Sequence, residues 1–189
     1  MNNDDSSIET QTHLDSLTMA RDMSLSSTFG SLATAAGKPG GESGYEPWYP
    51  NNVPVDSSVK LFITRFFEVS DDPDRNDEWV YFFREDATLI MMKDIAKGKD
   101  EIRKLRRDMW RDVEARKHRL VKLFPASFSP DQKAVMVMHE KEFMLFGAVA
   151  YRMKDGSEAV AGFAAHAQLR RDSLNASWKF VFYRVYVQK

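Results

Sequence analysis

The first apolar pattern along the chain has the spacing of a helix. Between residues 59 and 69 the apolar positions stand three and four apart, and Asp56 or Ser57 is placed to begin a helix there. The acidic stretch 70–77 contains a proline and predicts a loop. A second, short helix is predicted over 78–84.

A short apolar run at 87–92 is typical of a strand, and it follows an Arg-Glu-Asp step that ends at Asp86. We interpret Asp86 as a turn residue whose carboxylate accepts backbone N–H groups, rather than as a catalytic acid. After a polar connection, a long helix is predicted to begin at Lys99 or Asp100. Its apolar face is formed by Ile102, Leu105, Met109 and Val113.

The rest of the chain alternates between apolar and polar residues in segments that are separated by turn signals. This alternation predicts four strands, at 118–124, 134–147, 158–170 and 177–188. Because the helices come first and an antiparallel meander follows, the expected fold class is α+β.

The composition of the chain changes at residue 44. Residues 1–44 contain a single aromatic residue, Phe29, and many Ser, Thr and Gly residues, so they bury too little apolar surface to offset the entropy lost on ordering. We therefore expect a disordered or weakly ordered extension at 1–44 and one domain at 45–189. The chain has no apolar run long enough to span a membrane and no secretory signal pattern at its start, which predicts a soluble, cytoplasmic protein.

Residue usage excludes several kinds of chemistry. The chain has no cysteine, which excludes disulfides, thiolate nucleophiles and Cys-type zinc sites. No cluster of His and carboxylate residues has metal-ligand spacing and no Gly-rich phosphate loop is present, so neither a metal nor a cofactor is expected. Basic residues are frequent between 93 and 122, but acidic residues are interspersed among them. A solvated surface is predicted there, and not a nucleic-acid site.

Three local motifs, in a fixed order, resemble a known superfamily. They are Phe83 with Asp86-Ala87-Thr88, then Gly98 with Ile102, then Trp178 with Phe180. Together with the order of elements over 57–188, they resemble the nuclear-transport-factor-2-like superfamily, and within it the SnoaL-like group of polyketide cyclases, isomerases and dehydratases. The resemblance implies a cone-shaped, strongly bent, mixed or antiparallel sheet wrapped around about three helices. It also implies a small-molecule pocket inside the cone and a homodimer formed through the outer face of the sheet.

One enzyme of the superfamily, ketosteroid isomerase, allows a comparison of single positions. Where it has its carboxylate base, this chain has Met91, and its acidic oxyanion donor falls on Ala164. Both carboxyl groups are missing, so the resemblance argues against proton transfer by that pair of acids.

Scytalone dehydratase is similar in a different way. It has an active-site histidine where this chain has His118, and a Ser-x-Asn pair where this chain has His166 and Gln168, while its second histidine falls near Leu145. The resemblance therefore makes His118 and His166 the predicted catalytic residues, as general acid or base.

Each histidine also has a structural interpretation. His118 follows Arg116 and Lys117 at the end of the predicted long helix, where basic residues complement the negative helix terminus. Strand alternation alone directs His166 to solvent, whereas the resemblance directs it into the cone. We expect both imidazoles to open into one cavity if the protein is an enzyme.

The predicted function is a cofactor-free isomerase, cyclase or dehydratase that acts on an apolar, oxygenated metabolite of polyketide or terpenoid type. The alternative is a non-catalytic small-molecule-binding or protein-interaction module of the same fold. No nucleic acid or membrane partner is expected. The predicted substrate-binding residues are Gln168, Met91, Trp110, Phe143 and Tyr183.

Overall fold

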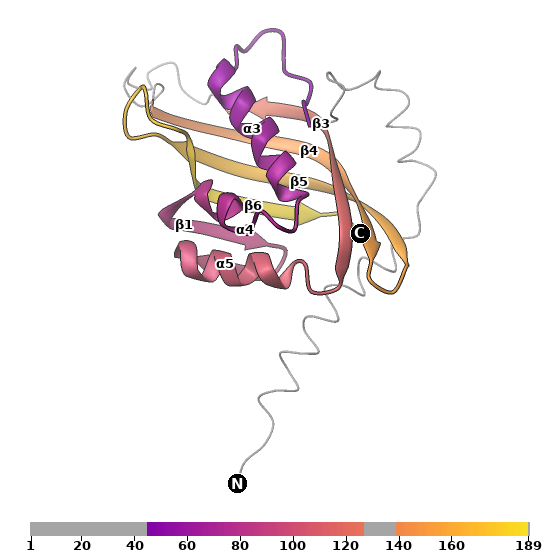
Figure 1. Ribbon diagram of the computed structural model, residues 1–189. Helices are drawn as coiled ribbons and strands as arrows, with labels where there is room; N and C mark the ends of the chain where they lie inside the picture. The colour runs from indigo at the N-terminus through magenta and orange to yellow at the C-terminus, as the bar shows by residue number, and fades with distance from the viewer. Residues whose placement is uncertain (1–44, 127–138, 189) are drawn as a thin grey trace.

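The computed structural model describes residues 45–126 and 139–188. The predicted extension at 1–44, and residues 134–138 of one predicted strand, lie outside the described residues. The described chain contains three helices and six strands (Figure 1). The helices are α3 (Ser57–Ser70), α4 (Asn76–Tyr81) and α5 (Gly98–Asp108). The strands are β1 (Phe83–Met91), β2 (Asp94–Lys97), β3 (Val113–Pro125), β4 (Glu140–Met153), β5 (Glu158–Arg170) and β6 (Lys179–Val187).

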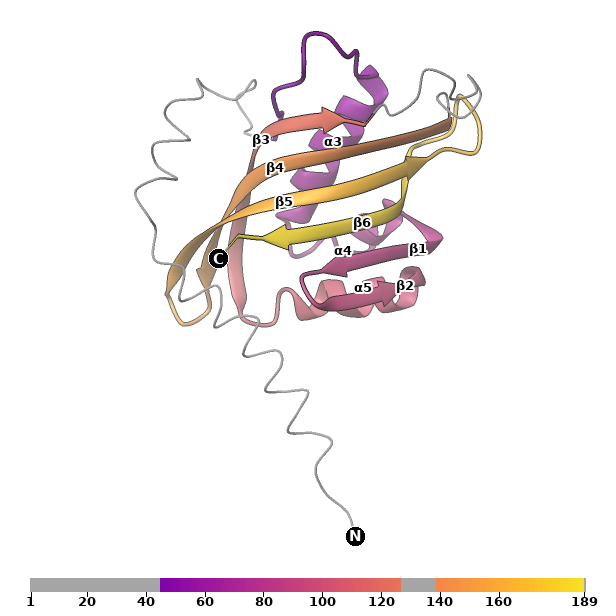
Figure 2. The same cartoon turned by 180° about the vertical axis from the view of Figure 1, so that it is seen from behind.

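The six strands form one open sheet in the order β2-β1-β6-β5-β4-β3. β1 runs parallel to β6, and every other neighbouring pair is antiparallel. The sheet is strongly bent and the three helices lie on its concave side (Figure 1). None of these helices covers the convex, outer face (Figure 2). The predicted α+β fold, a bent mixed sheet around three helices, is confirmed.

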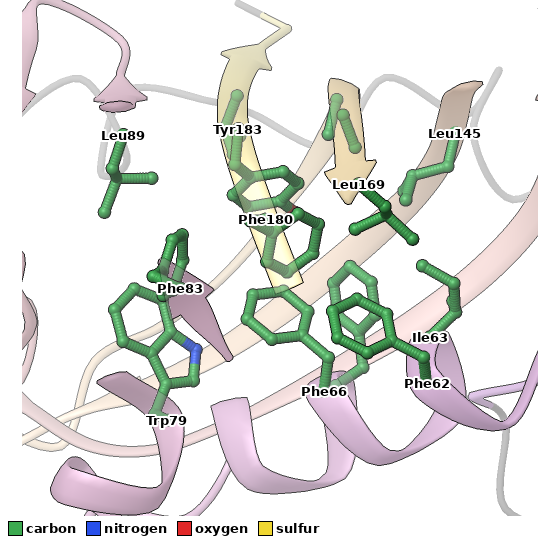
Figure 3. Close-up of a cluster of buried hydrophobic side chains, with 14 of the residues drawn as sticks. Phe62, Ile63, Phe66, Trp79, Phe83, Leu89, Leu145, Leu169, Phe180 and Tyr183 are labelled. Carbon is green, nitrogen blue, oxygen red and sulfur yellow. The ribbon is translucent and has the colours of Figure 1, made fainter. Parts of the chain in front are cut away.

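α3 fills the concave side of the sheet with aromatic side chains. Asp56 caps the helix by accepting a hydrogen bond from the Ser58 backbone N–H at 2.8 Å. The ring centroid of Phe66 lies 4.8 Å from that of Phe180 and 5.4 Å from that of Tyr183, with the rings edge to face (Figure 3). Such contacts add to the free energy gained from apolar burial. These contacts hold α3 against β6 and thereby position the C-terminal end of the helix over the sheet.

The residues before α3 extend along the edge of β3. The Trp48 N–H donates to Val121 O at 2.9 Å, and the Leu123 N–H donates to Trp48 O at 3.0 Å. This pairing covers part of β3, which is the edge strand of the described sheet. It also brings Tyr45 to the C-terminal end of α3, where its hydroxyl reaches Asp71.

Two expectations about the segment before α5 are wrong. α4 ends at Tyr81 and β1 begins at Phe83, so Asp86 lies inside a strand with 83% of its side chain exposed, and not in a turn. The predicted polar connection contains β2, which pairs with β1. Charged residues occur in both strands because one face of this edge of the sheet is exposed, which relaxes the need for apolar residues.

The long helix ends earlier than predicted. α5 ends at Asp108, and Val113 begins β3, which pairs with β4 along its length. The helical spacing from Met109 to Val113 did not reveal this change, because pairing with a distant strand overrides a local pattern. His118 consequently lies in the middle of a strand, so its interpretation as a residue that complements a helix terminus is wrong.

Candidate active site

A carboxylate and an imidazole meet on the concave side, where α3 ends against β3. Asp71 follows the last residue of α3, and the His118 ring lies against the rings of Phe67 and Phe163. His118 Nδ1 is 2.5 Å from Asp71 Oδ1. Asp71 Oδ2 accepts hydrogen bonds from the His118 backbone N–H at 2.7 Å and from the Tyr45 hydroxyl at 2.9 Å. These donors hold the carboxylate in one orientation.

The surroundings of this pair favour an ionised carboxylate and a neutral imidazole. Only 6% of the Asp71 side chain and 14% of the His118 side chain are exposed. Burial raises the pKa of Asp71, but the hydrogen bonds from His118 and the charge of Arg116 outweigh burial and hold that pKa below its usual value. Burial is also the largest effect on His118, and it lowers the pKa of the imidazole despite the opposing effect of Asp71. At neutral pH, His118 therefore donates Nδ1–H to Asp71 and presents an unprotonated Nε2.

Two buried arginines hold the C-terminal end of α3. Arg106 donates to the backbone oxygens of Val69, Ser70 and Asp72 at 3.2, 2.9 and 2.8 Å. Arg116 donates to Ser70 O through Nε at 3.0 Å and through Nη2 at 2.5 Å. The last carbonyl groups of a helix have no partner inside the helix and carry the negative end of its dipole, so cations stabilise them. The arginines thus fix the backbone on both sides of the candidate carboxylate.

Several polar atoms in this part of the molecule have no hydrogen-bond partner among residues 45–126 and 139–188. Tyr151 and Tyr183 come from β4 and β6, and burial raises the pKa of both hydroxyls, which keeps them protonated. Neither hydroxyl, nor Nε2 of His118, forms a hydrogen bond with a residue that the structure describes. The indole Nε1 of Trp110 is buried and is likewise unpartnered within the described chain. Unpartnered polar atoms in an apolar setting are where a bound molecule gains hydrogen bonds.

The second predicted histidine lies on the other face of the sheet. His166 Nε2 is 2.5 Å from Glu142 Oε1, and Gln168 donates to the same oxygen at 3.3 Å. A pocket of about 190 Å³ opens beside His166 on this outer face. The residues on either side of His166 are fully buried, so alternation along β5 directs its imidazole away from the helices. The expectation that His118 and His166 share one cavity is therefore wrong.

The predicted substrate-binding residues are divided in the same way. Tyr183 and Phe143 are buried in the aromatic core on the concave side, and Met91 packs against that core at the end of β1. Trp110 belongs to a smaller buried cluster near the start of β3. Gln168 lies with the outer pair on β5. Their roles in binding stay predictions.

Asp71 and Arg106 were missed in the sequence. Asp71 was counted among the acids of a predicted loop, although an acid at the C-terminal end of a helix is disfavoured by the helix dipole. The unfavourable place of this acid at the helix end was the signal in the sequence that could have identified Asp71. Arg106 stands four positions after Ile102, on the apolar face of its helix. An arginine on a buried face indicates that it has acceptors inside the fold.

Among residues 45–126 and 139–188, no group of three His, Asp or Glu side chains is arranged to hold a metal ion. Within the same ranges, none of the helices combines the length and the apolar character needed to cross a membrane.

Solved structures with the same architecture show what this chain is similar to. It aligns with a candidate scytalone dehydratase from Novosphingobium aromaticivorans at a TM-score of 0.58 and 13% identity, over 70% of this chain and 83% of that one. It aligns with a hexachlorocyclohexane dehydrochlorinase, LinA type 2, at a TM-score of 0.58 and 10% identity, over 70% and 84% of the chains. For ActVI-ORFA from Streptomyces coelicolor the TM-score is 0.55 and the identity 14%, over 70% and 96%.

Comparison by sequence finds neither a matching family model nor a matching curated protein. Identities as low as those of the aligned structures establish the fold and leave the activity to be argued from the site. The chain has the nuclear-transport-factor-2-like fold that its sequence resembles.

Proposed function

We propose that the protein is a cofactor-free enzyme in which His118 moves a proton of a small, apolar, oxygenated molecule. The observation that carries the proposal is the 2.5 Å contact between His118 Nδ1 and the buried carboxylate of Asp71. A carboxylate in this position holds the imidazole in one tautomer, with Nε2 as the base, and stabilises the imidazolium that forms when Nε2 takes a proton. The proposed reactions are isomerisation, cyclisation and dehydration of polyketide-type or terpenoid-type metabolites.

The proposed chemistry begins at a carbon atom next to a carbonyl group. Nε2 of His118 takes the proton from this carbon, the C–H electrons form a C=C bond, and the carbonyl π electrons move to oxygen. In an isomerisation, the imidazolium returns its proton to another carbon. In a cyclisation, the enolate attacks a second carbonyl group, and the resulting alkoxide takes the proton. In a dehydration, the β-hydroxyl group leaves with that proton as water.

The immediate surroundings of His118 suit this role. The Phe67 and Phe163 rings lie 5.1 and 5.5 Å from the imidazole, measured between centroids, and they keep water from one side of it. A site with little water strengthens the interaction between Asp71 and the imidazolium. His166 and Gln168 are not included in the proposed site because they lie on the outer face.

The competing function is a non-catalytic module that binds a small molecule or a protein. Two observations favour it. His166 does not share a cavity with His118, as an enzyme that uses both histidines would require. Phe66, Phe180 and Tyr183 also fill part of the cone with the chain's own side chains (Figure 3). The proton-exchange experiment described in the next paragraph distinguishes the two functions.

Exchange of carbon-bound protons tests the proposal without the natural substrate. A panel of cyclic ketones and aromatic β-diketones is dissolved in D₂O with the full chain, and NMR follows the loss of the signals from protons next to the carbonyl groups. We expect wild-type protein to accelerate exchange in at least one compound. His118→Gln is expected to lower that rate by about 10²–10⁴-fold. His139→Gln is the matched control and keeps the rate, because His139 directly precedes β4 and its backbone oxygen pairs with Arg171, away from His118, which pairs with Val149.

Equal rates for wild type and His118→Gln would remove His118 from the site. If no panel compound exchanges faster with the wild type, the enzyme proposal fails. Binding of the same ketones without exchange would then support the non-catalytic module.

We also propose that the protein forms a homodimer through the outer face of the sheet, as the resemblance implies. Phe124 and Phe146 lie there with 48% and 45% of their surfaces exposed, and their ring centroids are 5.6 Å apart. Adjacent exposed aromatic side chains are typical of a surface that another protein covers.

A further inference from the structure

Arg116 has a donor group that no oxygen or nitrogen atom of the described residues accepts from. Its side chain is only 6% exposed, and Nε and Nη2 both donate to Ser70 O. Among the described residues, Nη1 contacts only the sulfur of Met109, at 3.9 Å. A thioether sulfur is a weak acceptor. One end of the guanidinium group therefore keeps its capacity to bind a negatively charged oxygen.

Within the described parts of the chain, no carboxylate accepts a hydrogen bond from Arg116. Asp71 is the acid within ion-pair distance, at 3.7 Å from Nε, and its oxygens are engaged by His118 and Tyr45. Arg106, which is also buried, binds backbone and amide oxygens and forms no ion pair with any described residue. Two buried arginines therefore lie near a single carboxylate, which is unfavourable by itself, and an anionic ligand relieves it.

Trp110 supplies a second unused donor at the same place. The Arg116 guanidinium lies over the indole, with Cζ 4.5 Å from the ring centroid. Trp110 is only 8% exposed, and its Nε1 is buried without a partner in the described chain. Buried N–H groups without an acceptor are rare in folded proteins. This N–H lies next to the weakly bonded Nη1 of Arg116 and beside the Asp71–His118 pair, which indicates a place for an acceptor that the described residues do not supply.

We propose that Arg116 Nη1 and Trp110 Nε1 form an anion subsite, which binds a negatively charged oxygen of the substrate. The assignment of that oxygen to a substrate rests on the proposed function. The oxygen belongs to the enolate that forms when His118 takes a proton, or to a carboxylate or phenolate that the substrate carries throughout. A guanidinium group and an indole N–H both bind such an oxygen by charge-assisted hydrogen bonds, because the acceptor is ionised in each case.

Equilibrium binding of two simple anions, benzoate and 4-nitrophenolate, tests the subsite by calorimetry. We expect saturable binding of at least one anion by the wild type and also by His118→Gln. Trp110→Phe keeps an aromatic ring but lacks the N–H, and it is expected to weaken binding about threefold to tenfold. Arg116→Gln is expected to weaken it about tenfold or more, and Arg116→Lys by less. Arg119→Gln, on the exposed outer side of the same strand, is the matched control and leaves the affinity unchanged.

Kinetics of proton exchange then distinguish the two sources of the charge. For an enolate oxygen, Trp110→Phe lowers kcat at unchanged KM, and for a permanent anion it raises KM at unchanged kcat. Anion binding without any proton exchange would support the subsite and reject the enzyme, so the two failures are distinguishable. The subsite is overturned if the wild type binds neither anion saturably, or if Trp110→Phe and Arg116→Lys, shown to be folded by near-ultraviolet circular dichroism, bind as tightly as the wild type.

Discussion

At the scale of single residues, opposing effects set the charge of His118. Burial lowers the pKa of its imidazole and is the largest effect, the hydrogen bond and charge of Asp71 raise it, and the charges of Arg116 and Arg106 lower it again. The net result is a pKa below the ordinary value of 6.5. The imidazole is therefore unprotonated at neutral pH, which is the state of a general base.

We expect the rate of proton exchange to be constant above about pH 6.5 and to fall on acidification, as Nε2 becomes protonated. Asp71→Asn removes the charge that raises the pKa of His118, so this fall moves to lower pH. The same change is expected to lower the rate at pH 7 by about 10²–10⁴-fold. Without the carboxylate, the His118 imidazole is no longer held in the tautomer with a free Nε2, and the imidazolium that forms is no longer stabilised. The pH–rate profiles of both proteins measure these effects. A profile that Asp71→Asn leaves unchanged would contradict the role of the carboxylate.

The stability of the folded protein must be measured at each pH as a control, because acid is expected to lower both the stability and the exchange rate. The pKa of His118 is lower in the folded chain than in the unfolded chain, so the unfolded chain binds more protons as the pH falls through about 6.5. Acid therefore weakens the fold. Asp71, whose pKa is also lowered in the folded chain, adds to this loss at lower pH. Circular dichroism at each pH separates unfolding from protonation of the base.

At the scale of elements, the site depends on how α3 ends. Two nitrogens of Arg116, from β3, and one of Arg106, from α5, donate to the single oxygen of Ser70. Asp71 is the next residue, so its position relative to His118 depends on two elements that are distant in the sequence. The arginines replace the next turn of the helix as hydrogen-bond donors.

Replacement of Arg106 by Met keeps an unbranched side chain and removes the guanidinium group. The carbonyl oxygens of Val69 and Asp72 then lose their arginine donor. Val69 O keeps the Asp72 N–H at 3.3 Å, whereas the part-buried Asp72 O keeps no donor among the described residues, and such a loss costs about 1–3 kcal/mol. We expect the free energy of unfolding, measured in urea, to fall by about 1–3 kcal/mol. Arg103→Met, on the same helix with 37% of its side chain exposed, is the control and is expected to cost less than about 1 kcal/mol. Equal losses in the two variants would contradict this account.

At the scale of the whole molecule, the two faces of one sheet have different roles. The concave face holds the aromatic core and the Asp71–His118 pair, and three helices cover it (Figure 1). The outer face carries His166 and exposed aromatic side chains, and none of the described helices covers it (Figure 2). Alternation along the strands separates the two sets of side chains.

We expect Phe146→Glu to convert the proposed dimer to a monomer, because it places a charge in an apolar contact. Sedimentation velocity of the full chain measures the change in mass. Leu61→Glu is the matched control, since Leu61 is an exposed apolar residue on α3 and not on the sheet, and this variant is expected to stay dimeric. Sedimentation of the wild type as a monomer would reject the proposed dimer.

Elements with local signals were predicted well. α3 was predicted from its helical spacing and its capping aspartate, and the predicted strand at 158–170 matches β5 at both ends. The start of β3 was predicted poorly. Val113 continues the helical spacing of the preceding residues, and only its pairing with β4 shows that it belongs to a strand. His118 was singled out by resemblance, and its partner was not, since the signal at Asp71, an acid at the unfavourable end of a helix, was overlooked among the neighbouring acids.

By itself, the sequence determined the α+β order of elements, the amphipathic helix at α3, the absence of thiol chemistry and the presence of a histidine at position 118. Only the tertiary structure decided that this histidine meets Asp71 and that His166 faces away from it. The two residues of the pair are 47 positions apart in the chain. Their contact depends on the pairing and the bend of a six-stranded sheet, which are long-range properties that the spacing of neighbouring residues does not encode.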